Sequence, residues 1–430
     1  DADTESLLAV GRKHLCQLST LRWQQRDGLD TVLPYGVRRI HALRTLTTES
    51  VAVLMPFKAQ ELNHTNGIYY GQNAVSGNMI RIDRAQLLNG HSFRLGVSGS
   101  GKSMSAKEEL VEIALRTKDD ILILDPESEF GQLVKALGGE VLPISPHSSI
   151  HLNALDIDRA YGEGKNPLVD KVKLILSIFE PLTENGLTAK QRSLLDRCAE
   201  RVYRGYIRGG YRGTPPTLVD LRRVLLEQPE AEAHDLALAS ELYTTGSLNI
   251  FAHQTNVNTD ARILCYDIRE LDEQLRPVGM VVTLDAIFNR VIRNWRQGKR
   301  TWILADEFYI LFRYSFSAEF FYRLFKRMRK YNAFITAISQ NVDEILRSDT
   351  ARLMLANSEL LVMLNQAATD REELAKLLNI SENQLSYITN VPAGHGIIRC
   401  GGAIIPFENS FPKNTKLYRL MTTKPNEKFL

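Results

Sequence analysis

Hydrophobic positions along this chain follow two spacings in turn. Short runs of consecutive apolar residues, typical of buried strands, are separated by longer segments with apolar residues at helical spacing. The runs that predict strands lie at residues 68–71, 91–96, 121–125, 261–268, 301–305, 333–339, 360–364 and 396–407. Strands that alternate with helices are typical of a mostly parallel sheet, so the pattern predicts an α/β fold.

The spacing changes after about Gly162. From there to about Ala252 it is helical throughout, with breaks at Gly209-Gly210 and at Pro215-Pro216. We therefore predict an all-α subdomain inserted into the α/β body.

Composition excludes several classes of protein. Of 430 residues, 44% are hydrophobic and 24% charged, which excludes a disordered chain. The net charge of +3 does not by itself indicate a nucleic-acid binder. The cysteines Cys16, Cys198, Cys265 and Cys400 are too far apart for a metal knuckle, so we expect them to be reduced and mostly buried. No stretch approaches the ~18–20 apolar residues of a membrane span. The chain starts without Met and within a helical pattern, and we expect it to be a piece of a longer protein.

The strongest motif is GVSGSGKS, residues 96–103, between an expected strand and an expected helix. It fits the phosphate-binding loop G-x-x-x-x-G-K-[ST]. Gly99 and Gly101 allow the backbone to turn its N–H groups toward phosphate oxygens, Lys102 reaches the β- and γ-phosphates, and the Ser103 hydroxyl binds Mg²⁺. The residues expected to bind ATP are Gly96, Ser98, Gly99, Ser100, Gly101, Lys102, Ser103 and Met104.

Two acidic residues end the apolar strand TWILADE. Asp306 is expected to orient, through water, the Mg²⁺ that Ser103 binds, and Glu307 to polarise the attacking water. A kinase needs no such water activator, because its substrate supplies the nucleophile. The pair therefore favours an ATPase.

Further polar residues follow other expected strands. Gln340 ends the strand AFITAIS and is expected to sense the γ-phosphate or to position water. Asp125, in the cluster Asp125-Pro126-Glu127, lies at the same carboxyl edge, where α/β sheets bind ligands. It could instead cap the following helix, and the sequence leaves both interpretations open.

Arginines could complete the site of a neighbouring subunit by stabilising transition-state charge. The segment FKRMRKYNAF offers Arg329, which we favour for this role. Other candidates are Arg262, Arg352, Arg371 and Arg399.

Two arginine stripes also lie on expected helices. A solvated face is the favoured interpretation of the first, with phosphate binding or partner docking as alternatives; its members are Arg197, Arg201, Arg204 and Arg208. The second is expected to face solvent or a neighbouring subunit; its members are Arg290, Arg293 and Arg296.

The order of these motifs resembles that of the VirB-four-type ATPases of type IV secretion and conjugation, whose relatives include TraC-, TraE- and CagE-like proteins. The resemblance covers roughly residues 50–410. It is carried in order by GIYYGQN, DRAQLLNGHSFRLGVSGSGKS, ILILDPESEF, TWILADEFYILF, ITAISQNVDEIL and GHGIIRCGGAIIPF. Lys102 and Ser103 match the phosphate-loop pair, Asp306 and Glu307 the acidic pair, and Gln340 the glutamine motif. Gly394 and Gly396 match a late Gly-x-Gly segment.

The resemblance implies the C-terminal ATPase portion of such a protein, with a RecA-like P-loop fold of the HerA/FtsK group. It implies a remnant of an N-terminal domain or helical connector at residues 1–45, and an ATPase body at 46–162 and 253–430. The all-α insertion then spans 163–252. It also implies ATP and Mg²⁺ as cofactors, and self-association, with a hexamer as one form.

The implied partners are the channel components of type IV secretion and the coupling ATPase, with DNA as a candidate substrate. The implied location is cytoplasmic, at the inner face of the cell membrane, with membrane association through partners. Three functions stay open: a motor that energises pilus assembly and substrate transfer, a DNA-pumping translocase of the HerA/FtsK kind, and a non-hydrolysing scaffold controlled by nucleotide. Glu307 argues against the scaffold, because a pure switch needs no water activator.

Overall fold

A computed structural model describes residues 2–14, 16–41, 43, 45–53, 59–164, 166–312, 315–340 and 342–424. The chain divides into two compact units, Asp1–Lys58 and Ala59–Leu430. The first unit contains the helices α1 (Ala2–Lys13), α2 (Gln25–Val32) and α3 (Thr48–Val53).

The second unit is built on one large sheet. Over the described residues eleven strands join in the order β2-β1-β11-β10-β9-β3-β8-β7-β4-β6-β5. The strands from β9 to β5 run parallel, whereas β10, β11, β1 and β2 extend the sheet with antiparallel pairings. Their bounds are β1 Ile68–Asn73, β2 Met79–Ile82, β3 Ser92–Leu95, β4 Asp120–Asp125, β5 Glu140–Pro143, β6 Ile263–Asp267, β7 Thr301–Ala305, β8 Ala333–Ser339, β9 Leu360–Met363, β10 His395–Cys400 and β11 Ala403–Glu408. The prediction of an α/β fold with a mostly parallel sheet is confirmed.

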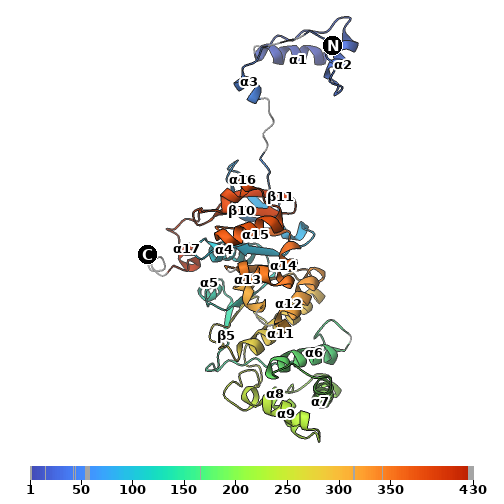
Figure 1. Cartoon of the computed structure of the whole chain (residues 1–430), viewed down its shortest axis with the longest axis vertical. Coiled ribbons are helices and arrows are strands. Elements are labelled where there is room, and N and C mark those ends of the chain that lie inside the picture. Colours follow the sequence, from blue (N-terminus) through green and yellow to red (C-terminus); the bar gives the residue numbers. More distant parts are fainter. Residues whose placement is uncertain are drawn as a thin grey trace. The chain divides into compact units, whose positions relative to one another are not determined.

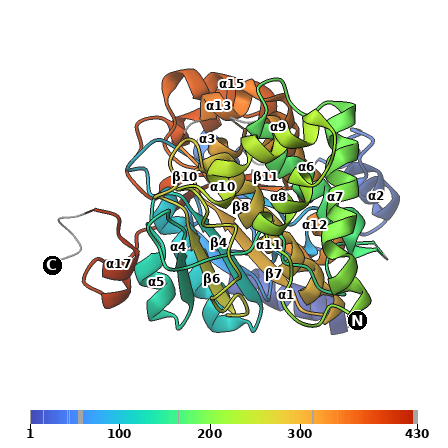
Figure 2. The same ribbon diagram turned by 90° about the horizontal axis from the view of Figure 1, so that it is seen from below.

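Helices cover both faces of the sheet, because successive strand residues point to opposite sides. On β4, Leu122 and Leu124 join one buried cluster, while Ile121 and Ile123 join the other. The second cluster lies under α4 (Lys102–Arg116), α5 (Gly131–Ala136) and α17 (Lys416–Met421). Figure 2 shows these three helices gathered at one side of β4 and β6.

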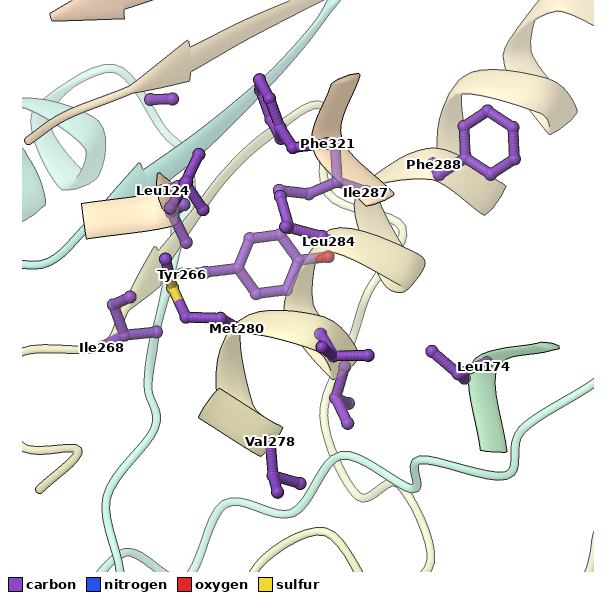
Figure 3. Packing of buried hydrophobic residues seen from close by; sticks show 14 of the residues in the cluster. Leu124, Leu174, Tyr266, Ile268, Val278, Met280, Leu284, Ile287, Phe288 and Phe321 are labelled. Carbon is purple, nitrogen blue, oxygen red and sulfur yellow. The ribbon is translucent and has the colours of Figure 1, made fainter. Parts of the chain in front are cut away.

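The first cluster packs against the remaining helices. Figure 3 shows the ring of Tyr266, from β6, lying against Met280 and Leu284 of α11. The helices on this side that follow β6 are α11 Arg276–Arg296, α12 Ser315–Met328, α13 Val342–Arg347, α14 Asp349–Ala356, α15 Ala368–Leu378 and α16 Glu382–Leu385.

All regular structure described between β5 and β6 is helical. The α-helices there are α6 Pro167–Phe179, α7 Ala189–Arg208, α8 Leu218–Leu226, α9 Ala231–Ala239 and α10 Glu241–Thr244. Helices α6 to α9 lie together (Figure 1), and their apolar faces join the same buried cluster as α11. Capping boxes at Thr188 and Thr217 satisfy the first N–H groups of α7 and α8. The predicted all-α insertion is therefore present, and its helix α6 packs against α11.

Candidate nucleotide site

The register of the parallel strands brings the predicted site residues to one edge of the sheet. Leu95, the last residue of β3, pairs with Ser339 at the end of β8, and Ala305 of β7 pairs with Ala337. The loop that begins at Gly96 therefore lies at the same edge as Asp306 and Gln340. Carboxyl edges of parallel sheets are the usual place for ligands in α/β folds.

The phosphate loop connects β3 directly to α4. Gly99 and Gly101 have φ angles of 78° and 102°. Glycine is favoured at such positive angles because it has no Cβ that would clash with the backbone. At Gly96 the obstacle is space, since a Cβ would lie 2.7 Å from the Ser100 Oγ. Because Gly101 is the N-cap of α4, the unpaired N–H groups of the first turn are directed at the loop, as an anion site requires.

Lys102 and Ser103 form the first turn of α4. Lys102 is 6% exposed, and its Nζ donates to the carbonyl of Val97 at 2.9 Å. Burial lowers the pKa of Lys102, although Glu307 and Asp306 oppose this effect. The ammonium is thus held inside the loop where a phosphate would bind. Met104 follows, and its side chain packs on the core under α4.

The acidic pair follows β7. The Asp306 N–H extends the ladder to the Leu124 carbonyl at 3.1 Å, and an Asp306 carboxyl oxygen accepts from the Glu307 N–H at 3.0 Å. Glu307 has a φ of 41°, a rare conformation for a side chain of this size. This turn carries two nearly buried carboxyl groups whose charges act on Lys102.

Burial and repulsion by neighbouring carboxylates raise the pKa values of both acids. Burial first, and then the charges of Glu129 and Glu307, raise the pKa of Asp306 well above its usual range. Burial raises the pKa of Glu307 to about 7, even though Lys102 opposes it. Among the described residues, the Glu307 Oε2 is buried without a hydrogen-bond partner. Buried carboxyl groups of this kind are suited to bind a cation or to accept a proton.

The two open interpretations of Asp125 are resolved by its contacts. Its carboxyl oxygens accept from the Glu129 and Phe130 N–H groups at 3.0 and 2.9 Å, so it fixes the turn that leads into α5. Glu129, four residues on, is an acid that the sequence argument missed. Its charge acts on Lys102, Asp306 and Glu307. The segment DPESEF was the available signal, but only its first two acids were considered.

The late glycine segment contacts the phosphate loop directly. The Gly394 N–H donates to the Ser100 carbonyl at 3.0 Å, and the Gly394 carbonyl accepts from the Asn409 N–H at 2.8 Å. A Cβ at Gly394 would lie 2.3 Å from the Asn409 carbonyl oxygen, and one at Gly396 would lie 2.1 Å from that of Met363. The β10–β11 hairpin therefore braces the loop and requires glycine at both positions.

A second brace comes from the end of β9. The Asn365 carbonyl accepts from the Val97 N–H at 2.8 Å, and the Gln366 Nε2 donates to the Leu95 carbonyl at 2.9 Å. Gln366 follows an expected strand, as Gln340 does, so the same argument applied to residues 360–364 would have drawn attention to its side chain, whereas the Asn365 contact is made by the backbone.

The other two residues predicted to be catalytic, Gln340 and Arg329, lie at opposite edges of the sheet. Gln340 is exposed at the carboxyl end of β8, and it makes no hydrogen bond to the described residues around it. Arg329 begins the short 3₁₀ helix Arg329–Tyr331 at the amino end of β8, roughly 20 Å away at ~3.3 Å per strand residue. There it lines a cavity of about 370 Å³ with Glu359 and Tyr322. Arg329 cannot reach the phosphate loop of its own chain.

The arginine stripes have local partners. Arg197 and Arg201 pair with Glu230 and Glu227 at 2.7 and 2.6 Å on an exposed face, in agreement with a solvated helix. The expectation for Arg290 was wrong. Its side chain is buried and pairs with Asp120 at 2.5 Å, because the amino end of β4 places that acid under α11. Arg262 caps the end of α4 through the carbonyls of Thr117 and Ala114.

Two family models match the chain. Residues 68–214 match the central domain of the helicase HerA, and residues 242–395 match the TraG P-loop domain. The first range contains the phosphate loop, and the second contains Asp306, Glu307, Gln340 and Gly394. A comparison with curated proteins gives no match.

Solved structures share the fold. VirB4 of Thermoanaerobacter pseudethanolicus is 23% identical with a TM-score of 0.72, over 83% of this chain and 99% of that chain. The bacterial conjugative coupling protein TrwB in its trigonal form with sulphate is 15% identical with a TM-score of 0.50, over 87% and 95%. TrwB in complex with the ATP analogue ADPNP is 14% identical with the same TM-score, over 87% and 95%.

The sheet order and the loop after β3 define a P-loop ATPase fold of the RecA-like class. Within that class the chain has the VirB4-type fold, built from a HerA-type central part and a TraG-type P-loop part. The resemblance noted from the sequence is thereby confirmed.

Proposed function

We propose that the chain is an ATP-hydrolysing motor of a type IV secretion or conjugation system. The observation that carries the proposal is the arrangement of Lys102 within the phosphate loop opposite Asp306 and Glu307. In this role Ser103 and Asp306 hold Mg²⁺, Lys102 binds the β- and γ-phosphates, and Glu307 takes a proton from the attacking water. The oxygen-rich donor set fits a small hard cation such as Mg²⁺.

The proposal includes Gln340 as the sensor of the γ-phosphate. It also includes Arg329 as the group that acts on the site of a neighbouring copy, since its own site is out of reach. Self-association, as a hexamer or a smaller assembly, follows from that role. Because of the likeness in fold to VirB4, the proposal also includes the expected partners and location. These are the channel components, the coupling ATPase and the inner face of the cell membrane. No described helix has the length and hydropathy needed to span a bilayer.

The test is phosphate release from Mg·ATP, measured against protein concentration, with and without single- and double-stranded DNA. We expect multiple turnovers that Lys102→Ala abolishes, and a specific activity that rises with concentration. Stimulation by DNA would favour the translocase of the HerA/FtsK kind, while indifference to DNA would favour the secretion motor. Release that is absent from both proteins at every concentration would contradict the proposal.

A further inference from the structure

A buried charged network lies between α4 and the strands β3 and β8, on the α4 face of the sheet. Arg84, Arg94 and Glu109 are each at most 1% exposed. Buried charges are expensive unless they are paired and hydrogen-bonded. Their partners are therefore informative about why this cluster is present.

Glu109 is the hub of this network. Its carboxylate accepts from the Tyr70 hydroxyl at 2.6 Å and from Arg84 at 2.9 Å, and it pairs with Arg94 at 2.9 Å. The Thr336 hydroxyl donates to its second oxygen at 2.9 Å. Burial alone would raise the pKa of Glu109, but Arg94 and Arg84 outweigh it and lower that pKa to about 2. The carboxylate is therefore ionised throughout the physiological range.

Thr336 connects the two sides of the network. Its Oγ accepts from Arg84 at 2.6 Å while its own proton goes to Glu109. Arg84 also donates to the Ile335 carbonyl at 2.7 Å and lies 5.1 Å from the ring of Trp302. The Thr336 hydroxyl thus has both its donor and its acceptor used by charged groups, which makes its position well defined.

The network joins the strands and the helix that carry the proposed nucleotide site. Arg94 lies on β3 two residues before Gly96, and it also donates to the Ser105 hydroxyl on α4 at 2.7 Å. Glu109 lies on the helix that begins with Lys102, and Thr336 lies on β8, the strand that Gln340 follows. The network therefore fixes the phosphate loop, its helix and the strand of the sensor glutamine relative to one another.

We propose that Thr336 is a positioning residue for ATP hydrolysis, which through Glu109 and Arg84 holds the Gln340 strand in register with α4. This inference rests on the proposed ATPase function. Sub-ångström placement of reacting groups affects the chemical step far more than it affects binding of the nucleotide. A variant that loses the link should therefore lose turnover and keep affinity.

The test uses the full chain and Thr336→Val, which keeps the shape but removes the hydroxyl. We expect kcat to fall at least tenfold, with the affinity for a fluorescent ATP analogue within twofold of wild type. Thr336→Ser should restore kcat. The control is Thr283→Val on α11, because Thr283 is equally buried and its hydroxyl lacks a partner among the described residues. Its kcat should match wild type.

If Thr336→Val does not fold, Thr336→Ala removes the same hydroxyl with a smaller side chain and is expected to show the same loss of kcat. A kcat within twofold of wild type would overturn the inference, and so would a parallel loss of kcat and affinity. If the wild type and Thr336→Val are both fully active, this inference is refuted while the proposed function stands. An inactive wild type would refute the proposed function and this inference with it.

Discussion

The backbone N–H of Gly394 donates to the carbonyl of Ser100 at 3.0 Å, across almost three hundred positions of sequence. The contact ties the middle of the phosphate loop to the hairpin formed by β10 and β11. A Cβ built on Gly101 would lie 3.1 Å from the Gly394 nitrogen, so the two backbones meet with no room for side chains. The shape of the loop therefore depends on a segment near the end of the described chain.

Gly394→Ala should weaken ATP binding. The added methyl would meet the Asn409 carbonyl at 2.3 Å, and the φ of 85° is unfavourable for alanine, so the 394–395 turn must shift away from Ser100. We expect the affinity for Mg·ATP to fall on the order of tenfold, about 1.4 kcal/mol. Isothermal titration calorimetry measures this directly.

The matched control for that variant is Gly402→Ala in the β10–β11 turn, where a Cβ meets nothing within 4 Å. It should bind as wild type does. Equal affinities for Gly394→Ala and wild type would show that the hairpin does not brace the loop.

Glu307 should make the stability of the nucleotide-free protein depend on pH. Its pKa is raised from 4.5 to about 7, so the folded state holds the proton more tightly than the unfolded state does. That stabilisation is fully present below the unfolded pKa and is lost as pH rises through about 7. Glu307→Gln should therefore raise the unfolding temperature relative to wild type at pH 8, with little difference at pH 5. A thermal melt series checks this, and a constant difference across pH would contradict the burial argument.

Arg329 should act only between chains. Arg329→Ala and Lys102→Ala should each be inactive alone, whereas a mixture of the two should regain part of the wild-type phosphate release. The regain is expected because an assembly can pair an intact loop from one copy with an intact arginine from another. Arg223→Ala, on the exposed face of α8, is the control and should keep full activity. A mixture that releases no phosphate, or an Arg329→Ala protein that is active alone, would refute the proposed role of Arg329 between chains.

The sequence was sufficient where one strand ends in one motif. The functional residues of GVSGSGKS and TWILADE each come directly after a buried strand. Because these strands are parallel, their register brings Gly96 and Asp306 to one edge of the sheet. The strands β2 and β5 were missed because they are short and only partly buried, so neither forms an apolar run.

Contacts between distant segments could not be predicted. The contacts of Gly394 and Asn365 with the phosphate loop depend on which strand becomes the neighbour of β3. The local spacing of apolar residues does not determine the order of the strands in the sheet. Arg290 illustrates the same limit. A stripe of arginines on a helix is typical of an exposed face, but here Asp120 from another element lies beneath it and forms an ion pair.

The most direct measurement is steady-state phosphate release by wild type and Glu307→Gln under saturating Mg·ATP, with Glu273→Gln, at an exposed turn before α11, as the control. The proposed role of Glu307 is to take a proton from the attacking water and not to bind the nucleotide, so its loss should separate binding from hydrolysis. We predict many turnovers per chain for wild type and for the control, and a rate at least a hundredfold lower for Glu307→Gln with ATP still bound. Equal turnover by all three proteins would contradict the account.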